Sequence, residues 1–424
     1  MTKYQSFRFE SYYFDSTKKQ LKLRYAYDNQ LNFTEKYIFD FEYTDYNEQV
    51  LDRALQTLFF MAGISYYKCY MSPEITVDKG TIDKNLAQFL SETYEKGLGE
   101  FFYVNNLDPE TAIKFPMNSE TLNMLSIEGS GQIVGIGGGK DSLVSVELLR
   151  SNPNVGTWSL SHRTQLEPLI SEIGLAHLHV DRQWDPKLLE LNDQGAYNGH
   201  VPISAILACV GTVVAILAGK RDVVVSNENS ANEPTLTYRG QDINHQYSKS
   251  LSFELLYQNL LQAQYGDNLR YYSLLRQYSE LKICEMFARG GFEKYKKSFS
   301  SCNRAFTHNS SQMFWCGECP KCAFVFLALS PFIEHGELEN LWGKNLLHDE
   351  KLVPIYKQLL GIEGNKPLEC VGEIKEARSA MQLAICTYPE LANTYSFEIP
   401  DDYDYRALAH HAVPQDIAGV LVNQ

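Results

Sequence analysis

The 424-residue sequence is poor in positive charge, with 38 Lys and Arg residues against 52 Asp and Glu and a formal net charge of −14. Affinity for nucleic-acid backbones comes from clustered Lys and Arg, so this balance excludes a non-specific nucleic-acid binder. It leaves room for a local basic pocket that takes a small anionic substrate. Internal repeats and low-complexity tracts are also lacking. A hydrophobic content of 44% is typical of a globular protein with two or three domains.

A secretory signal is missing as well, because MTKYQSFRFESYYFD alternates polar and aromatic residues without an apolar core. We therefore expect a cytoplasmic protein, whose nine cysteines bind metal or remain thiols rather than form disulfides. Residues 201–219, VPISAILACVGTVVAILAG, lack charge and reach the length of a membrane span. Their small residues, their leading proline and their place between strand-like segments favour a buried helix instead, and no membrane partner.

The pattern of expected strands and helices changes near residue 130. Residues 1–125 combine strand-like aromatic segments with amphipathic helices, which predicts an α+β N-terminal domain. Beyond them, short apolar strands expected at 132–136, 156–161, 176–182 and 221–228 alternate with helices expected at 141–150 and 201–219. This alternation predicts an α/β fold with a doubly wound parallel sheet, whose ligand crevice lies at the carboxyl ends of the strands. The expected boundaries are 1–125, 126–299, 300–335 and a helical 336–424.

A glycine loop follows the first of these strands, in IVGIGGGKDSLVSVELLR. Three glycines let main-chain N–H groups approach a ligand, and the helix behind them offers a positive dipole end, which together make an anion cradle. Lys140 would neutralise a phosphate, Ser142 would donate a hydrogen bond, and Asp141 would hold Mg²⁺ or a ribose. Neither G-x-x-x-x-G-K-[ST] nor G-x-G-x-x-G fits the sequence.

The loop resembles the PP-loop, S-G-G-x-D-[ST], of the N-type ATP pyrophosphatases, with Gly137 in place of the first serine. Those enzymes cleave ATP between the α and β phosphates and hold the pyrophosphate in this loop. The resemblance implies ATP and Mg²⁺ as cofactors. As a hypothesis, Asp141 and Glu228 are the magnesium ligands. The expected ATP-binding residues are Ile136, Gly137, Gly138, Gly139, Lys140, Asp141, Ser142 and Ser161.

Three cysteines form CGECPKC, a C-x2-C-x2-C pattern, and a fourth lies fourteen residues upstream. Four thiolates suit tetrahedral Zn²⁺ in a closed structural site, and C-x2-C turns present two sulfurs to one ion. An iron–sulfur cluster is the alternative. The predicted metal ligands are Cys302, Cys316, Cys319 and Cys322.

The order of these motifs is also that of the 7-cyano-7-deazaguanine synthases, PP-loop enzymes that activate a carboxylate and carry a four-cysteine zinc site. Their Pro-x-Arg-Asn pattern is replaced here by residues 202–205, Pro-Ile-Ser-Ala, so this carboxylate-activating ligase reading is the alternative. Over essentially the whole chain the sequence resembles the MurL family, the UDP-N-acetylmuramoyl-L-alanyl-L-glutamate epimerases. The matched segments include GLGEFFYVN, GIGGGKDSLVS, GAYNGHVP, VVVSNENSA, NHQYSK, WCGECPKCAFVFLALSPF and KPLECVGE.

This resemblance implies ATP- and Mg²⁺-dependent inversion of the terminal L-glutamate of UDP-MurNAc-L-Ala-L-Glu, with release of AMP and pyrophosphate, in bacterial peptidoglycan precursor synthesis. It implies functional coupling to the ligase that adds L-glutamate. As hypotheses, the catalytic residues are Lys140, Asp141, Cys370 and His200, and the substrate-binding residues are Arg239, His245 and Lys249. An inert buried cysteine, structural histidines and solvated basic side chains are the alternatives for Cys370, the two histidines, and Arg239 and Lys249.

Overall fold

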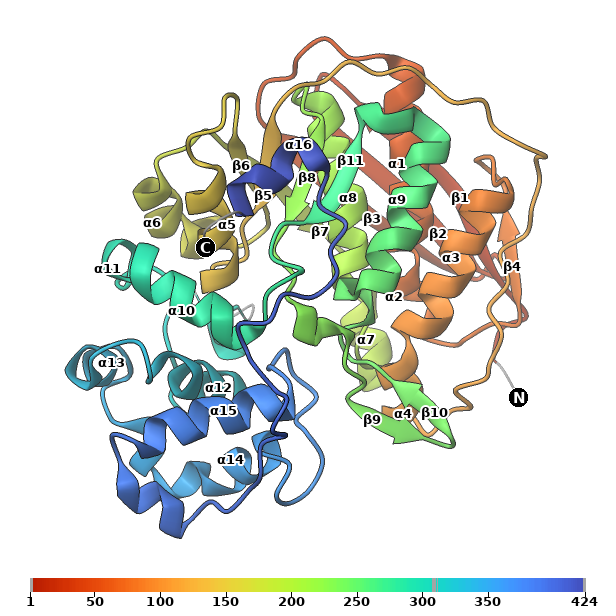
Figure 1. The fold of residues 1–424 in the computed structure, drawn as a ribbon. Helices are drawn as coiled ribbons and strands as arrows, with labels where there is room; N and C mark the ends of the chain where they lie inside the picture. The colour runs from red at the N-terminus through yellow and green to blue at the C-terminus, as the bar shows by residue number, and fades with distance from the viewer. Residues whose placement is uncertain (1–2, 307–309, 311, 422–424) are drawn as a thin grey trace.

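A computed structural model describes residues 3–306, 310 and 312–421. Its centre is a nine-stranded sheet in the order β11-β8-β5-β6-β7-β3-β2-β1-β4 (Figure 1). The neighbours from β11 to β7 are parallel, as are β1 and β4, while β7, β3, β2 and β1 pair antiparallel. The strands are β1 (Ser6–Asp15), β2 (Gln20–Tyr27), β3 (Leu31–Asp40), β4 (Glu74–Val77), β5 (Gln132–Gly135), β6 (Gly156–Leu160), β7 (His177–Gln183), β8 (Asp222–Val225) and β11 (Arg270–Ser273). The predicted α/β fold is confirmed, and the sheet is mostly parallel, but antiparallel N-terminal strands extend the expected parallel sheet beyond β7.

The N-terminal strands join the same sheet as the later ones, because β3 pairs with β7. The expected domain boundary near residue 125 therefore lies in a segment that connects two sets of strands of the same sheet. A separate two-stranded hairpin, β9 (Leu236–Tyr238) and β10 (Gln241–Ile243), projects beside α4 (Gly99–Val104) (Figure 1). The N-terminal region is thus part of the frame around the central strands.

The central strands contribute side chains to two hydrophobic cores, one on each face of the sheet, because successive side chains of a strand point to opposite faces. Ile133 and Val223 belong to one core, and the next residues, Val134 and Val224, belong to the other. Buried side chains of α1 (Glu48–Ala62), α3 (Lys84–Gly97), α8 (Ile203–Leu217) and α9 (Leu251–Tyr265) fill the first. Those of α5 (Lys140–Leu149), α6 (Arg163–Ile173), α10 (Glu280–Gly290), α12 (Pro320–Leu329) and α15 (Ile374–Ile385) fill the second.

The uncharged segment expected as a buried helix is α8, and that prediction is confirmed. Twelve of its fifteen residues are buried, and α8 packs against α1 and contacts β5, β6 and β8. Gly211 permits the close approach, because a Cβ there would lie 2.8 Å from Val223 Cγ1 and 2.9 Å from Trp158 Cζ2. Among the residues that the structure describes, no helix is long and apolar enough to cross a membrane.

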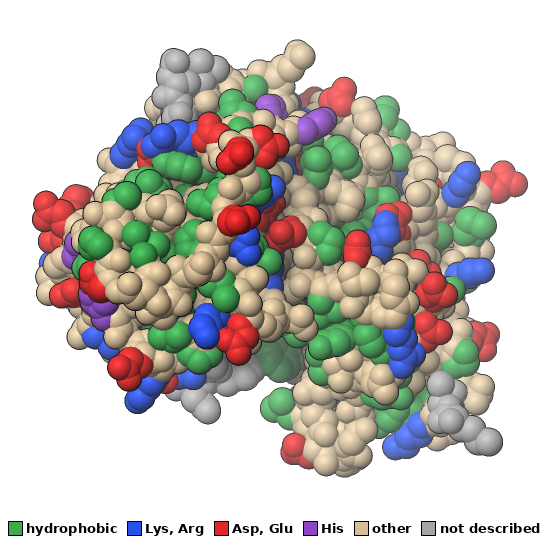
Figure 2. Space-filling model, turned by 60° about the horizontal axis from the view of Figure 1, so that its bottom comes forward, with side chains coloured by type: hydrophobic (Ala, Val, Ile, Leu, Met, Phe, Trp, Pro, Cys, Tyr) green, Lys and Arg blue, Asp and Glu red, His purple; other side chains and the backbone are tan. Residues whose placement is uncertain are grey.

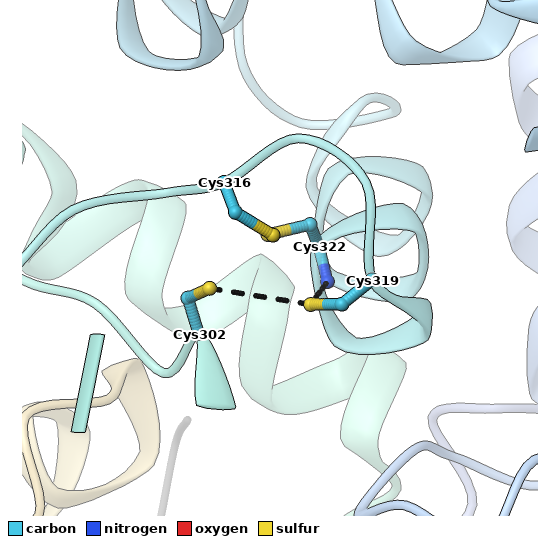
Figure 3. Close-up of side chains that lie close together, drawn as sticks. All are labelled: Cys302, Cys316, Cys319 and Cys322. Atoms are coloured by element: carbon cyan, nitrogen blue, oxygen red, sulfur yellow. Dashed lines mark hydrogen bonds between the residues drawn. The ribbon is translucent and has the colours of Figure 1, made fainter. Parts of the chain in front are cut away.

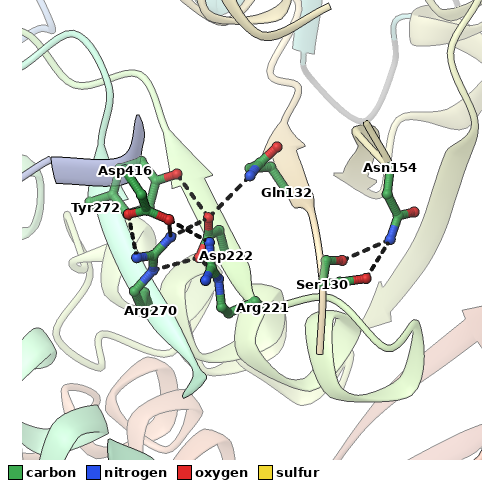
Figure 4. A network of polar contacts seen from close by, with 8 residues as sticks. All are labelled: Ser130, Gln132, Asn154, Arg221, Asp222, Arg270, Tyr272 and Asp416. Carbon is green, nitrogen blue, oxygen red and sulfur yellow. Dashed lines mark hydrogen bonds and ion pairs between the residues drawn. The ribbon is translucent and has the colours of Figure 1, made fainter. Parts of the chain in front are cut away.

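The remaining helices are short: α2 (Ile64–Tyr67), α7 (Lys187–Asp193), α11 (Phe292–Tyr295), α13 (His335–Trp342), α14 (Val353–Leu359) and α16 (Gln415–Ala418). Helices α12 to α15 form a lobe beside the sheet, and the chain then returns to place α16 next to β8 and β11 (Figure 1). A polar network ties it there (Figure 4). The fully buried Asp222 accepts hydrogen bonds from Arg270 at 2.7 and 2.8 Å, and Arg270 also pairs with Asp416 at 2.8 Å. This network lies at the amino ends of the parallel strands.

Candidate functional site

A cavity of about 350 Å³ opens at the carboxyl ends of β5, β6 and β8. Strand β5 is the first of the parallel strands in the chain and lies in their middle, with later strands added on both sides. Such a reversal of strand order leaves a crevice where open α/β sheets bind ligands. The residues that line it are Gly135, Ile136, Gly137, Gly139, Asp141, Ser142, Trp158, Ser159, Leu160, Ser204, Leu207, Val225, Ser226, Asn227, Lys249, Tyr271, Ser301, Asn303, Phe306, Lys321 and Cys370.

The glycine loop forms one wall of this cavity. Around Gly137 there is open space, since a Cβ there would meet nothing within 4 Å. Gly138 has φ +91°, and a Cβ on it would lie 2.9 Å from the carbonyl oxygen of Ser300. Gly139 begins α5 without a side-chain cap, which leaves main-chain N–H groups at the helix end for an anion. The loop therefore fits the phosphate cradle expected from the sequence.

Lys140, expected to bind phosphate, is not among the residues that line the cavity. Its ammonium is buried and pairs with the carboxylates of Asp141 and Glu280, the latter at 2.7 Å. Burial opposes the charged form of Lys140, but Asp141 and the other anionic groups beside it raise its pKa above the ordinary value. Among the described residues that line the cavity, the cations are instead Lys249 and Lys321.

Asp141 lines the cavity and keeps a partly exposed carboxylate. Burial works against ionisation, yet Lys140 and Lys321 lower its pKa below the usual range. Glu228 is buried, and its charge contributes to the raised pKa values of Lys249 and Glu280. Mg²⁺ is commonly held by one or two carboxylates together with substrate phosphates. Asp141 is placed for such a role, whereas the expected Glu228 is not among the residues that line the cavity.

Cys370 lines the same cavity as the glycine loop, and its thiol meets two cations. Lys249 Nζ is 3.1 Å from Cys370 Sγ, and His245 hydrogen-bonds the same sulfur. Burial alone would raise the pKa of this thiol, but Lys249, His245 and Lys321 lower it from 9.0 to about 6. Cys370 is therefore a thiolate at neutral pH, which is the form that acts as a base or nucleophile.

Behind Cys370, His245 hydrogen-bonds Glu100 through Nδ1. Burial lowers the pKa of His245, but Cys370 and Glu100 outweigh it and raise that pKa to about 9. His200 lies beside His245 with the rings tilted by 45°; the ring centroids are 4.6 Å apart, and His200 Nδ1 is 3.7 Å from Glu100. Burial, followed by the charge of His245, lowers the pKa of His200 to about 4. Glu100, His245 and Cys370 thus form a carboxylate–imidazolium–thiolate row that ends at the cavity.

Two expected ligand contacts lie elsewhere. Ser161 does not line the cavity, and its hydroxyl accepts a hydrogen bond from the N–H of Arg182 at 3.2 Å. Ser159 and Leu160 take its place in the wall. Arg239 sits exposed in the turn between β9 and β10, where it donates to Asn106 at 2.9 Å and stacks on Tyr238.

The four cysteines converge beside the start of α12 (Figure 3). Cys302 Sγ lies 4.0 Å from Cys319 Sγ, and Cys316 Sγ lies 3.7 Å from Cys322 Sγ, with all four thiols free. Zn–S bonds of about 2.3 Å in a tetrahedron place sulfurs about 3.8 Å apart. Thiolates bound to separate irons of a cluster would be farther apart, so the cluster fits one tetrahedral ion.

One face of the molecule carries mixed charge. On the face that Figure 2 shows, Lys and Arg side chains are interspersed with Asp and Glu rather than gathered into one broad basic stripe. The positive charge that a small anion would meet is instead the pair Lys249 and Lys321 inside the cavity. These two lysines make the cavity a local basic pocket, which the negative net charge of the whole chain does not exclude.

Two known family models match most of the chain. The family model of the MurL N-terminal domain matches residues 1–274, and that of the MurL C-terminal domain matches residues 298–395. The chain belongs to the MurL family. A protein of Xanthomonas oryzae pv. oryzae named UDP-N-acetyl-alpha-D-muramoyl-L-alanyl-L-glutamate epimerase is 41% identical over 79% of this chain and 75% of its own length. Proteins of the same name from Salinispora tropica and a Micromonospora species are each 36% identical over 89% of this chain and over 84% and 86% of their own.

Three residues of this MurL-family site escaped the sequence reasoning: Glu100, Glu280 and Lys321. Glu100 and Lys321 stand in segments that carried the family resemblance, GLGEFFYVN and CGECPKC. A sequence pattern does not reveal their roles, because Glu100 stands alone among apolar neighbours and Lys321 lies within the cysteine motif. Glu280 begins α10, and only the tertiary fold brings it to Lys140.

Proposed function

We propose that this protein inverts the terminal L-glutamate of UDP-MurNAc-L-Ala-L-Glu to D-glutamate, with ATP as a consumed substrate and AMP and pyrophosphate as products. The relatives that carry the epimerase name support the overall reaction. The observation that carries the proposal is that the Cys370 thiolate and the glycine loop line one cavity. The reaction belongs to the cytoplasmic stage of peptidoglycan precursor synthesis, after a ligase has added L-glutamate.

Activation of the glutamate carboxylate explains the need for ATP. A free carboxylate disfavours a carbanion on the adjacent carbon, whereas an acyl adenylate withdraws electrons from it. The carboxylate oxygen attacks the α-phosphorus, and the bond to the β-phosphate oxygen breaks to release pyrophosphate. The main-chain N–H groups of residues 137–139, together with Lys249 and Lys321, suit that leaving anion. When bound, Mg²⁺ would neutralise phosphate charge, with Asp141 as its holder.

Cys370 then removes the Cα proton. Its thiolate is formed at neutral pH by Lys249 and His245, and Glu100 holds His245 from behind. Reprotonation from the other face gives the D configuration, and water hydrolyses the mixed anhydride to release AMP. Since a general base needs a pKa near the working pH, the value of about 6 for Cys370 suits this step.

Two measurements on the purified protein test this function. Incubation with ATP, Mg²⁺ and UDP-MurNAc-L-Ala-L-Glu should yield D-glutamate on hydrolysis, and AMP with pyrophosphate in the mixture. In D₂O, Cys370→Ala should stop deuterium incorporation at Cα while AMP release continues. The matched control is Cys386→Ala, which alters an exposed thiol at the end of α15. An amide product formed with ammonia would instead favour the ligase alternative.

A further inference from the structure

The four-cysteine cluster lies against the cavity and not apart from it. Ser301 and Asn303, which flank Cys302, both line the cavity wall. Lys321, which stands between Cys319 and Cys322, lines it as well. The segments that bring the sulfurs together therefore also form part of the pocket.

One of these segments clamps the glycine loop. The N–H of Ser300 donates to the carbonyl oxygen of Gly138 at 2.9 Å. A Cβ on Gly139 would lie 3.1 Å from the Cβ of Ser301, and one on Gly138 would lie 2.8 Å from Phe306 Cζ. The glycine loop and the chain around Cys302 are therefore packed so closely that not even a methyl group would fit between them. A shift of one segment must then move the other.

The other segment holds Cys370. Cys319 is the N-cap of α12, and its sulfur accepts a hydrogen bond from the N–H of Cys322 at 3.4 Å. Lys321, in the first turn of that helix, is only 9% exposed, and its ammonium donates to the carbonyl oxygen of Cys370. The cysteine sulfurs fix the end of α12, and α12 fixes the lysine that meets the thiol-bearing residue.

We propose that the four-cysteine centre organises the catalytic pocket, and that Lys321 is the positioning residue through which the end of α12 holds Cys370. The centre thus has two attachments, one to the glycine loop through residues 300–303 and one to Cys370 through Lys321. A metal site that only stabilised the fold at a distance from the pocket would have neither attachment. The proposal rests on the proposed function for the catalytic role of Cys370, but its test does not need turnover.

The test is the rate at which Cys370 reacts with iodoacetamide at pH 5, followed by mass spectrometry of its peptide in the full-length, metal-loaded protein without nucleotide. Lys321→Met should slow that rate at least about threefold, which corresponds to about half a pKa unit, because a cation and an anchor are both lost. Lys321→Arg should restore most of the rate, since arginine can still donate to the carbonyl. Lys357→Met, on the exposed side of α14, is the matched control and should react as the wild type does.

Removal of the metal by chelation, with metal content measured before and after, tests the other half. Cys370 in the metal-free protein should slow toward the rate of Lys321→Met while the far-ultraviolet circular dichroism is retained. If the protein unfolds without metal, the metal-loaded Lys321→Met variant decides alone. Wild-type reactivity of Cys370 in Lys321→Met, with metal bound, overturns the proposal whether or not the protein proves to be an epimerase.

Discussion

Replacing Lys249 by methionine tests how the protein makes a thiolate of Cys370. Of the groups that lower the pKa of Cys370 from 9.0 to about 6, Lys249 is the largest, followed by His245 and Lys321. Three pKa units correspond to about 4 kcal/mol of preference for the anion. If Lys249 supplies a third of this, its loss raises the pKa of Cys370 to about 7. At pH 6 the thiolate fraction then falls from about one half to about one tenth.

The assay is the pH dependence of Cys370 alkylation, read from its peptide by mass spectrometry in the absence of substrates. Wild-type protein should show a midpoint near pH 6, and Lys249→Met a midpoint at least one unit higher. Lys96→Met is the control, because Lys96 contacts the ring of Tyr247 in the same loop but not the thiol. A wild-type midpoint near that of a free thiol, or one that Lys249→Met leaves in place, refutes this reasoning.

Four further outcomes follow from the same structure. Epimerisation should follow a bell-shaped pH profile that rises near pH 6 and falls near pH 9 as His245 loses its proton, and Glu100→Gln should move the falling limb to lower pH in initial-rate assays. Asp141→Asn should abolish pyrophosphate release in a coupled assay while the melting temperature is retained. Asp222→Asn should lower the free energy of unfolding by about 3 kcal/mol in urea titrations. Cys302→Ala should reduce bound zinc, measured by mass spectrometry, from about one equivalent per chain.

Much of the fold could be predicted from hydrophobic rhythm. Ile133 and Val134 feed opposite cores, and β5, β6, β7 and β8 lie within a few residues of the expected strands. The antiparallel pairing of β3 with β7 could not be predicted, because it joins segments about 140 residues apart and depends on register alone. The return of Asp416 to Asp222 and Arg270 is likewise a tertiary event without a local pattern.

The candidate site divides in the same way. The glycine loop and the cysteine cluster could be predicted, because consecutive glycines and C-x2-C spacing are each visible within a few residues of the sequence. The contacts of His245 with Glu100 and with Cys370 could not be predicted, because the three residues come from distant segments of the chain. Lys140 matches the sequence pattern of a phosphate ligand, yet its buried ammonium pairs with Glu280 and does not line the cavity. Buried ion pairs of this kind are set by the packing of α5 against α10.

The most direct test of the central claim is a single reaction in D₂O that contains the protein, ATP, Mg²⁺ and UDP-MurNAc-L-Ala-L-Glu, with nucleotide products and glutamate configuration determined together. We predict D-glutamate deuterated at Cα, with AMP and pyrophosphate formed. Formation of ADP and orthophosphate, or inversion that proceeds equally well without ATP, would contradict the shared cavity of glycine loop and thiolate as the site of reaction.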